Sequence, residues 1–279
     1  MNWTFFLLAI LAVILVALLG LRLWDEWADR KEWARLAALQ PTEPERYDPA
    51  MVVGLPEAAR RFFNFAIASG TPLFTVAEID MAGQFSLGSR DKPNYQQMDA
   101  RQILAAPEGF VWKLRLPGVV PISGSDSGQW TRFRVLGLLP VARSGGDINH
   151  ARAAYGRCVS EALFWTPAAL LPGPGIVWEG VDSNTARVTV YNKGLSQTVE
   201  VKLDNDGRPT EVLFMRWSDA NPEKIHRLQP FGGKLSDFRE VQGFRLPFGV
   251  EAGNGYGTGD YFAFFKAELR TIRFPVNGL

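Results

Sequence analysis

The chain has 279 residues, of which 47% are hydrophobic and 21% charged. This length suits one large or two small folded domains. A formal net charge of +1 excludes a general attraction to nucleic acid. The single cysteine, Cys158, excludes an intrachain disulfide and leaves the cellular compartment open. Nine Trp and nineteen Phe residues indicate a thick core or an apolar cavity.

The N-terminal segment from Trp3 to Trp24 has no charge before Arg22 and a tryptophan at each end. As a helix it would be about 33 Å long, enough to cross the hydrocarbon core of a bilayer. The alternative is a cleaved signal peptide, but the charged start, the shorter apolar run and the small-residue cleavage site are missing. The sequence therefore predicts a single-pass anchor in the inner (cell) membrane, within a helical segment 1–39 that continues past the bilayer.

Two sequence features disagree about which side of the membrane the C-terminal domain lies on. Four cations follow the span and none precedes it: Arg22, Arg30, Lys31 and Arg35. The positive-inside rule favours a cytoplasmic C-terminal domain. These cations are interleaved with acidic residues, however, and only two residues stand before the span. We predict that the C-terminal domain is periplasmic (extracytoplasmic), in keeping with a resemblance described below.

Three prolines make residues 40–50 a stiff linker to a β-rich domain at 51–279. A short helix is expected from Leu55 to about Ser69. Strand patterns follow at 73–81, 84–89, 95–106, 110–116, 129–136, 176–181, 186–191, 198–204, 210–217, 244–251 and 261–274. Their lengths suit successive antiparallel hairpins.

One helix interrupts the strands, at about 147–171. Asp147 is a ready N-cap, and apolar residues from Ile148 to Trp165 fall on one helical stripe. Thr166-Pro167 then restarts the helix. The predicted fold class is mainly β (α+β): a curved antiparallel sheet or half-barrel wrapped around a central helix, with an N-terminal transmembrane helix.

Signals for metal, nucleotide or nucleophilic chemistry are weak. Two histidines and one cysteine stand at no metal-ligand spacing, so neither metal nor another cofactor is predicted. Asp204-x-Asp206-Gly207 suits a hairpin turn better than a calcium loop. The glycines at 253–259 precede a strand pattern rather than the helix that a dinucleotide site needs. No Gly-x-Ser-x-Gly elbow is present. Enzymatic activity stays open, and the sequence leans against it.

Glu161 is the polar residue that stands out, because it lies beside Phe164 and Trp165 on the central helix. Burying its carboxylate without a partner would be costly, and Arg157 lies one helical turn away. One interpretation is a structural ion pair that ties the helix to the sheet. The other is a polar anchor that orients the head group of an amphiphile in an apolar cavity. We predict no catalytic residue. The candidate ligand-binding residues are Glu161, Trp165, Arg216, Trp217 and Arg239.

Several strings in the second half of the chain resemble an uncharacterised family of bacterial and archaeal proteins that carries a domain of unknown function. These strings include Ser160-Glu161-Ala162, Trp165-x-Pro167, Arg216-Trp217, Pro230-Phe231-Gly232-Gly233 and Gly243-Phe244-Arg245-Leu246-Pro247. The resemblance covers about 73–274 and implies a single-pass membrane or exported protein without an assigned activity. The strand succession also resembles the half-barrel of LolA-like lipoprotein carriers, at the level of fold alone.

Together these patterns predict a membrane-anchored envelope protein that binds a lipid or another apolar ligand in a concave β-sheet cavity. One alternative is a hydrolase-type enzyme that uses Glu161 with an arginine. Another is an envelope scaffold that binds a protein through an aromatic groove. A deep apolar pocket favours the first, a polar cleft at Glu161 the second, and a filled interior beside a flat apolar patch the third. The sequence leaves the ligand and the oligomeric state open.

Overall fold

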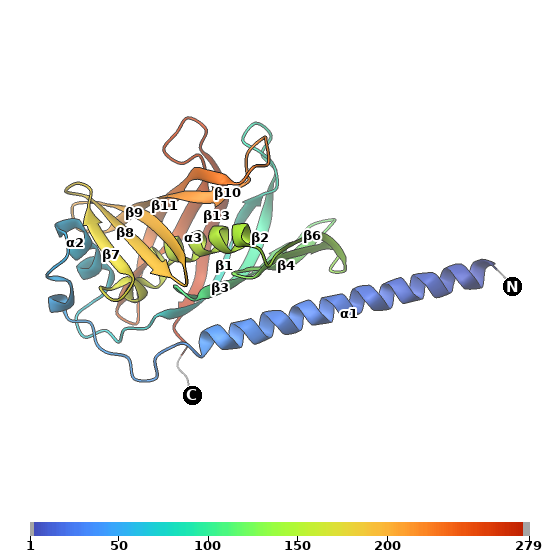
Figure 1. The fold of residues 1–279 in the computed structure, drawn as a ribbon, viewed down its shortest axis with the longest axis horizontal. Helices are drawn as coiled ribbons and strands as arrows, with labels where there is room; N and C mark the ends of the chain where they lie inside the picture. Colours follow the sequence, from blue (N-terminus) through green and yellow to red (C-terminus); the bar gives the residue numbers. More distant parts are fainter. Residues whose placement is uncertain (1–2, 276–279) are drawn as a thin grey trace.

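Thirteen strands form one antiparallel sheet, which curls around a helix in the computed structural model of residues 3–275 (Figure 1). The helices are α1 (Trp3–Ala37), α2 (Glu57–Ala66) and α3 (Ile148–Trp165), with 3-10 turns at Pro49–Val52 and Pro167–Leu170. The strands are β1 (Val76–Ser86), β2 (Tyr95–Ala105), β3 (Gly109–Leu116), β4 (Ile122–Ser127), β5 (Trp130–Val135), β6 (Leu139–Gly145), β7 (Ile176–Gly180), β8 (Thr185–Asn192), β9 (Leu195–Leu203), β10 (Pro209–Ser218), β11 (Arg227–Val241), β12 (Phe244–Asn254) and β13 (Phe262–Arg273). The predicted fold class is confirmed.

The connectivity explains why the helix lies inside the curl. Strands β1 to β6 follow one another from the middle of the sheet to one edge. The chain then passes through α3 to the opposite edge, where β7 starts a second succession that ends with β13 beside β1. Because α3 connects the two edges, it crosses the concave face, where it contacts β9, β10, β12, β2 and β3.

Close strand approach at glycines allows the sheet to curl. A Cβ atom on Gly83 of β1 would lie 2.0 Å from the carbonyl oxygen of Lys266, and one on Gly233 of β11 would lie 2.0 Å from that of Glu251. Both distances are far below van der Waals contact, so only glycine fits at these positions. Glycine inside a strand commonly marks such a bend or close approach.

The central helix begins as its sequence predicts. The Asp147 carboxylate accepts a hydrogen bond of 2.9 Å from the backbone N–H of His150, which lowers the pKa of that carboxyl. Tyr155, Cys158 and Trp165 are buried along one stripe. Ile148 was expected on this stripe, but it is 64% exposed. The first turn contacts the sheet through polar groups instead, such as the His150 ring and the Ser127 carbonyl at 3.0 Å.

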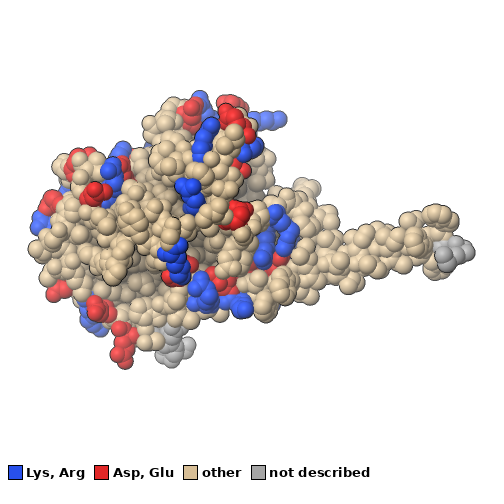
Figure 2. Space-filling view, viewed as in Figure 1, with Lys and Arg blue, Asp and Glu red and all other residues tan. Residues whose placement is uncertain are grey.

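Helix α1 continues past the apolar run and docks on the outer face of the sheet. Leu36 is fully buried in a small second core with Val76, Ile103 and Val111. The Trp33 indole donates a 2.7 Å hydrogen bond to Glu78. The outer part of α1 projects from the body and carries no charged side chain, whereas charges of both signs are mixed over the body (Figure 2). It is long and apolar enough to cross a membrane.

Two buried carboxylates fix α1 to the strands β3 to β6. Asp25 contacts three arginines of β5 and β6, with Arg143 at 2.6 Å, Arg132 at 3.3 Å and Arg134 also hydrogen-bonded. Asp29 accepts a 2.7 Å hydrogen bond from Ser125 of β4. Both aspartates are at most 5% exposed. The C-terminal third of α1 is therefore held by the fold through charge as well as apolar packing.

The segment predicted as a stiff linker packs against the β-rich part. The Tyr47 ring is buried and its hydroxyl donates a 2.8 Å hydrogen bond to Asn64 of α2. The Gln40 amide donates to the carbonyl of Val76 at 3.0 Å. The expected boundaries of the β-rich domain, 51 and 279, remain predictions, and residues 276–279 lie outside the described part.

Some strand predictions were wrong. Residues 84–89 were expected to form a partner strand, but β1 continues through Gln84 and Phe85 and pairs with β2 and β13. Strands β4, β6 and β11 were not predicted. β4 is polar on both faces, β6 is exposed along its whole length, and β11 contains Pro230 and the Gly232-Gly233 pair. None of them has the alternation of apolar and polar residues that marks a half-buried strand.

Candidate functional site

A cavity of about 470 Å³ lies between α3 and the concave face of the sheet. Its wall contains a chain of touching aromatic rings. Phe214, Phe231, Phe264, Phe85 and Trp112 follow one another with ring centroids 5.3, 5.9, 5.7 and 6.0 Å apart. A cavity of this size with mostly apolar walls and a few convergent polar groups is typical of a small-molecule site.

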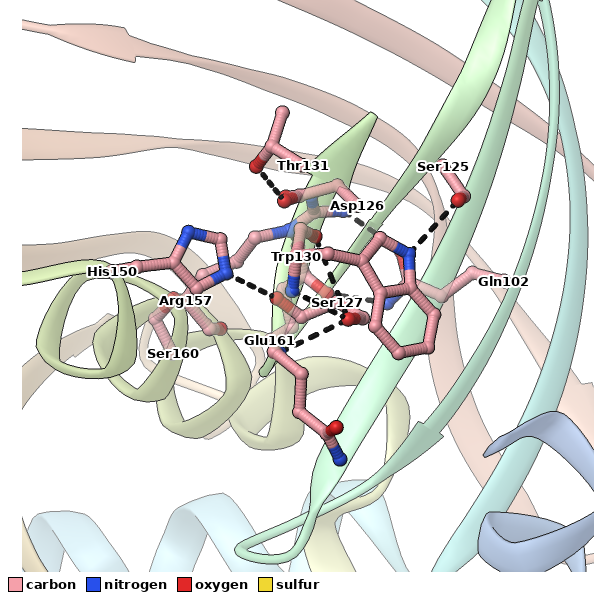
Figure 3. A network of polar contacts seen from close by, with 11 residues as sticks. Gln102, Ser125, Asp126, Ser127, Trp130, Thr131, His150, Arg157, Ser160 and Glu161 are labelled. Atoms are coloured by element: carbon pink, nitrogen blue, oxygen red, sulfur yellow. Dashed lines mark hydrogen bonds and ion pairs between the residues drawn. The ribbon is translucent and has the colours of Figure 1, made fainter. Parts of the chain in front are cut away.

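The polar groups of this cavity converge on Arg157 of α3 (Figure 3). Its Nε donates to Glu161 at 2.7 Å, its Nη1 to Asp126 of β4 at 3.0 Å, and its Nη2 to Gln102 of β2 at 2.9 Å. Gln102 also donates to Glu161, and Thr131 donates to Asp126 at 2.6 Å. The network thus connects the central helix to three strands of the sheet.

The Arg157 guanidinium is stabilised as a cation by this network. Burial works against its charge, but the carboxylates of Glu161 and Asp126 outweigh it and raise the pKa of Arg157. The guanidinium also lies over the rings of Phe110 and Trp112, at 4.5 and 4.8 Å from their centroids. Both carboxylates are consequently engaged by a permanent positive charge.

Arg216 of β10 enters the same cavity without such partners. Its side chain is half-buried, and its Nε atom is shut off from solvent. Within residues 3–275, Nε has no hydrogen-bond partner, and no ion pair forms with the guanidinium. The guanidinium lies over the Phe231 ring, 4.9 Å from its centroid. Burial, followed by repulsion from Arg157, lowers the pKa of Arg216.

The structure brings three of the five candidate ligand-binding residues together. Glu161, Trp165 and Arg216 all line the cavity. Trp165 is almost fully buried, and its indole donates to the carbonyl of Pro247 at 3.4 Å.

Trp217 and Arg239 lie elsewhere. Because neighbouring residues of a strand point to opposite faces, Trp217 turns away from the cavity that Arg216 enters. Its indole donates to Asn149 at 2.9 Å, and the Arg152 guanidinium stacks over it at 3.7 Å. Arg239 is exposed, and its Nη2 pairs with Asp237 at 2.5 Å. Neither residue is in place to contact a ligand bound beside Glu161.

Sequence reasoning missed Asp126, Gln102 and Trp112. Asp126 lies on β4, which has no strand pattern, so nothing indicated that it faces inward. Gln102 and Trp112 lie on strands that were predicted at 95–106 and 110–116. The alternation of β3 could have placed Trp112 on the same face as Phe110 and Leu114.

A larger, shallower depression of about 690 Å³ lies on the sheet away from the Arg157 network. Lys234, Glu251 and Lys266 are cross-strand neighbours there. Alternating charges on paired strands stabilise a sheet surface, which accounts for these residues without a ligand. Within residues 3–275, no three His, Cys, Asp or Glu side chains cluster as metal ligands would.

The fold and the cavity define a mainly β protein in which a curled, open antiparallel sheet encloses a central helix beside an aromatic-lined pocket. The chain belongs to the family of unknown function DUF6544, whose model matches residues 45–267. The predicted membership of an uncharacterised family is therefore confirmed. No curated protein matches the chain.

Solved structures with a similar course of the chain include three bacterial proteins. A LolA superfamily protein from Nitrosomonas europaea has a TM-score of 0.39 and 10% identity, covering 78% of this chain and 91% of that one. An outer membrane lipoprotein-sorting protein domain from Vibrio parahaemolyticus has a TM-score of 0.33 and 10% identity, covering 73% and 87%. A DUF1329 family protein from Desulfovibrio piger has a TM-score of 0.35 and 11% identity, covering 84% and 96%.

Proposed function

We propose that this protein is a membrane-anchored envelope protein that holds a lipid or another apolar ligand in the cavity beside α3. The observation that carries the proposal is the chain of aromatic rings along one wall of a 470 Å³ cavity. In a densely packed interior such rings would fill the space between helix and sheet. Here they leave room for an apolar chain, and burying that chain is favourable in proportion to its apolar area.

The mouth of the cavity lies toward the proposed membrane. Leu87 and Val141 line the cavity and are 49% and 58% exposed. The β5–β6 hairpin that carries Val141 has Leu136 at its tip, 59% exposed, and there Arg22 of α1 donates to the Gly137 carbonyl at 3.1 Å. Since Arg22 is the first charge after the apolar run, the hairpin tip reaches the level where the bilayer ends. A lipid would pass from bilayer to cavity with little exposure to water.

The ion-pair cluster at Asp25 supports an uncleaved anchor. Removal of a leader of about 25 residues would take this carboxylate away and leave Arg132, Arg134 and Arg143 facing one another on β5 and β6. Like charges gathered without a counter-charge destabilise a fold. A helix used only as a signal would not need a buried contact of this kind.

Ligand occupancy can be tested by native mass spectrometry of the full-length protein released from neutral detergent. We expect co-purified lipid on the wild-type protein. Ala142→Trp, at an exposed position that lines the cavity mouth, should reduce the lipid-bound fraction at least several-fold because the indole fills the entrance. Ala220→Trp, at an exposed loop position away from the cavity, is the matched control and should leave the fraction unchanged. Equal occupancy in both variants would rule out this cavity as the binding site.

The hydrolase alternative depends on Glu161, which lines the same cavity. A general base needs a free carboxylate oxygen near the proton that it accepts. Glu161 Oε1 accepts from Arg157, and Oε2 accepts from Gln102. This geometry favours the predicted structural ion pair over proton transfer.

We further propose that α1 stays in the membrane and that the β-rich domain is periplasmic. Alkaline carbonate washing should leave the full-length protein in the membrane pellet. A C-terminal alkaline phosphatase fusion should be active, and a green fluorescent protein fusion should be dark. The opposite fusion pattern would place the domain in the cytoplasm, as the cation count after the span favours. A soluble product about 25 residues shorter would indicate a signal peptide.

A further inference from the structure

We propose that the ligand carries an anionic oxygen head group, a carboxylate or a phosphate, and that Arg216 binds it inside the cavity. This inference rests on the proposed function, since it names the polar end of the ligand held in the same cavity. The geometry that supports it is two buried N–H donors that have no acceptor among residues 3–275. They are Nε of Arg216 and Nε1 of Trp112, and both residues line the cavity.

Arg157, the other arginine of the cavity, has a hydrogen-bond acceptor for each of its three guanidinium nitrogens. Arg157 places Nε, Nη1 and Nη2 on Glu161, Asp126 and Gln102. These bonds use the carboxylates that line the cavity, so Arg216 has none left to pair with. A buried donor without an acceptor is unfavourable, and for a charged group the penalty is larger. Nε of Arg216 is therefore a buried donor for which residues 3–275 provide no acceptor.

The missing acceptor must come with an apolar body, because the aromatic wall lies directly beside it. Arg216 lies over the Phe231 ring, which belongs to the chain of rings that ends at Trp112. An anionic amphiphile meets both requirements, with its oxygens on the guanidinium and its chain along the rings. The oxygen of a neutral lipid would leave the charge of the guanidinium without a counter-charge. A cationic head group would meet two arginines, while the carboxylates of Glu161 and Asp126 are already engaged by Arg157.

The test compares three probes with the same sixteen-carbon chain on the full-length protein in neutral detergent. Hexadecanoate, hexadecyl phosphate and hexadecanol compete with a neutral fluorescent naphthylamine. We expect at least one anionic probe to bind roughly 10- to 100-fold more tightly than the alcohol, as a charge-assisted hydrogen bond implies. Which anion binds more tightly identifies the head group as carboxylate or phosphate.

Substitution of Arg216 makes the assignment specific. Arg216→Met should reduce the affinity of the anionic probes to that of hexadecanol and leave hexadecanol binding unchanged. Arg239→Met, the same change at an exposed arginine outside the cavity, should keep the wild-type preference. Arg216→Lys keeps the charge and should retain part of the preference. Because Arg216→Met removes a half-buried cation whose Nε atom has no acceptor within residues 3–275, it should also raise the melting temperature of the ligand-free protein.

The outcomes separate this inference from the proposed function. If acid, phosphate and alcohol bind equally well to the wild-type protein, the cavity binds apolar chains and the role of Arg216 is refuted. The same holds if Arg216→Met keeps the preference for anions. If none of the three probes binds the wild-type protein, the proposed function fails as well.

Discussion

Arg157→Met is expected to lower the free energy of unfolding by about 3–5 kcal/mol, because breaking a buried ion pair leaves the remaining charges uncompensated. The variant removes the arginine that Glu161 and Asp126 share as a partner. It also removes the donor to the side-chain oxygen of Gln102. Methionine keeps most of the length of the side chain, so little of the loss would come from packing. Chemical denaturation of the full-length protein in detergent, followed by tryptophan fluorescence, measures the difference.

A matched arginine on the sheet provides the control for this prediction. Arg187 pairs with Glu200 at 2.5 Å, but the two side chains are 39% and 31% exposed. Surface pairs contribute little, so Arg187→Met should cost less than about 1 kcal/mol. Glu161→Gln should fall between the two variants, because the amide oxygen still accepts from Arg157 and the second carboxylate, Asp126, remains. Equal stabilities of the Arg157 and Arg187 variants would contradict the structural role of the network.

Asp25→Asn is expected to cost a similar amount, about 3–5 kcal/mol, by removing the charge that three arginines surround. Asparagine has the same shape, but it keeps only one of the two acceptor oxygens and places an NH2 group against the arginine donors, so both the charge and an acceptor are lost. The expected consequence is local unfolding: the C-terminal third of α1 detaches from β5 and β6 before the sheet unfolds. Limited proteolysis should then cut between residues 25 and 50 at protease concentrations that leave the wild-type protein intact.

The neighbouring residue Glu26 supplies the control. It pairs with Arg22 at 2.8 Å, and the two side chains are 33% and 45% exposed. Glu26→Gln removes one negative charge from the same helical turn but should change neither stability nor proteolysis. If both variants resist protease as the wild-type protein does, α1 is not held by the Asp25 cluster.

The sequence predicted those parts of the fold that depend on local signals. The central helix was recognisable from its N-cap at Asp147 and its buried stripe, and the strands β9 and β13 from alternation. Strands that are stabilised by polar partners far away in the sequence could not be recognised from such local signals. Ser125 of β4 faces Asp29 of α1, while Asp126 faces Arg157, so both sides of that strand are polar. No periodicity remains in such a segment to distinguish it from a loop.

The same distinction applies to the candidate site. The pair Arg157–Glu161 follows from i, i+4 spacing on one helix, which fixes the two side chains as neighbours. Arg216 was selected for its position beside apolar residues in a strand, and the structure places it in the cavity. Trp217 and Arg239 were predicted to bind the same ligand, but they lie elsewhere. Only the curvature of the sheet decides which strand residues face α3, and curvature depends on contacts between strands that are far apart in the sequence.

The docking of α1 has a consequence for how the proposed ligand would be exchanged. No flexible hinge separates the apolar run from the body, because Asp25, Asp29 and Leu36 hold the helix directly after it. With α1 in a bilayer, the body would diffuse laterally and rotate about the membrane normal, while its tilt and its height stayed fixed. Its search for ligand would be two-dimensional. Delivery to an acceptor would then require that acceptor to reach the same membrane surface, so the rate of transfer should scale with surface density rather than with bulk concentration.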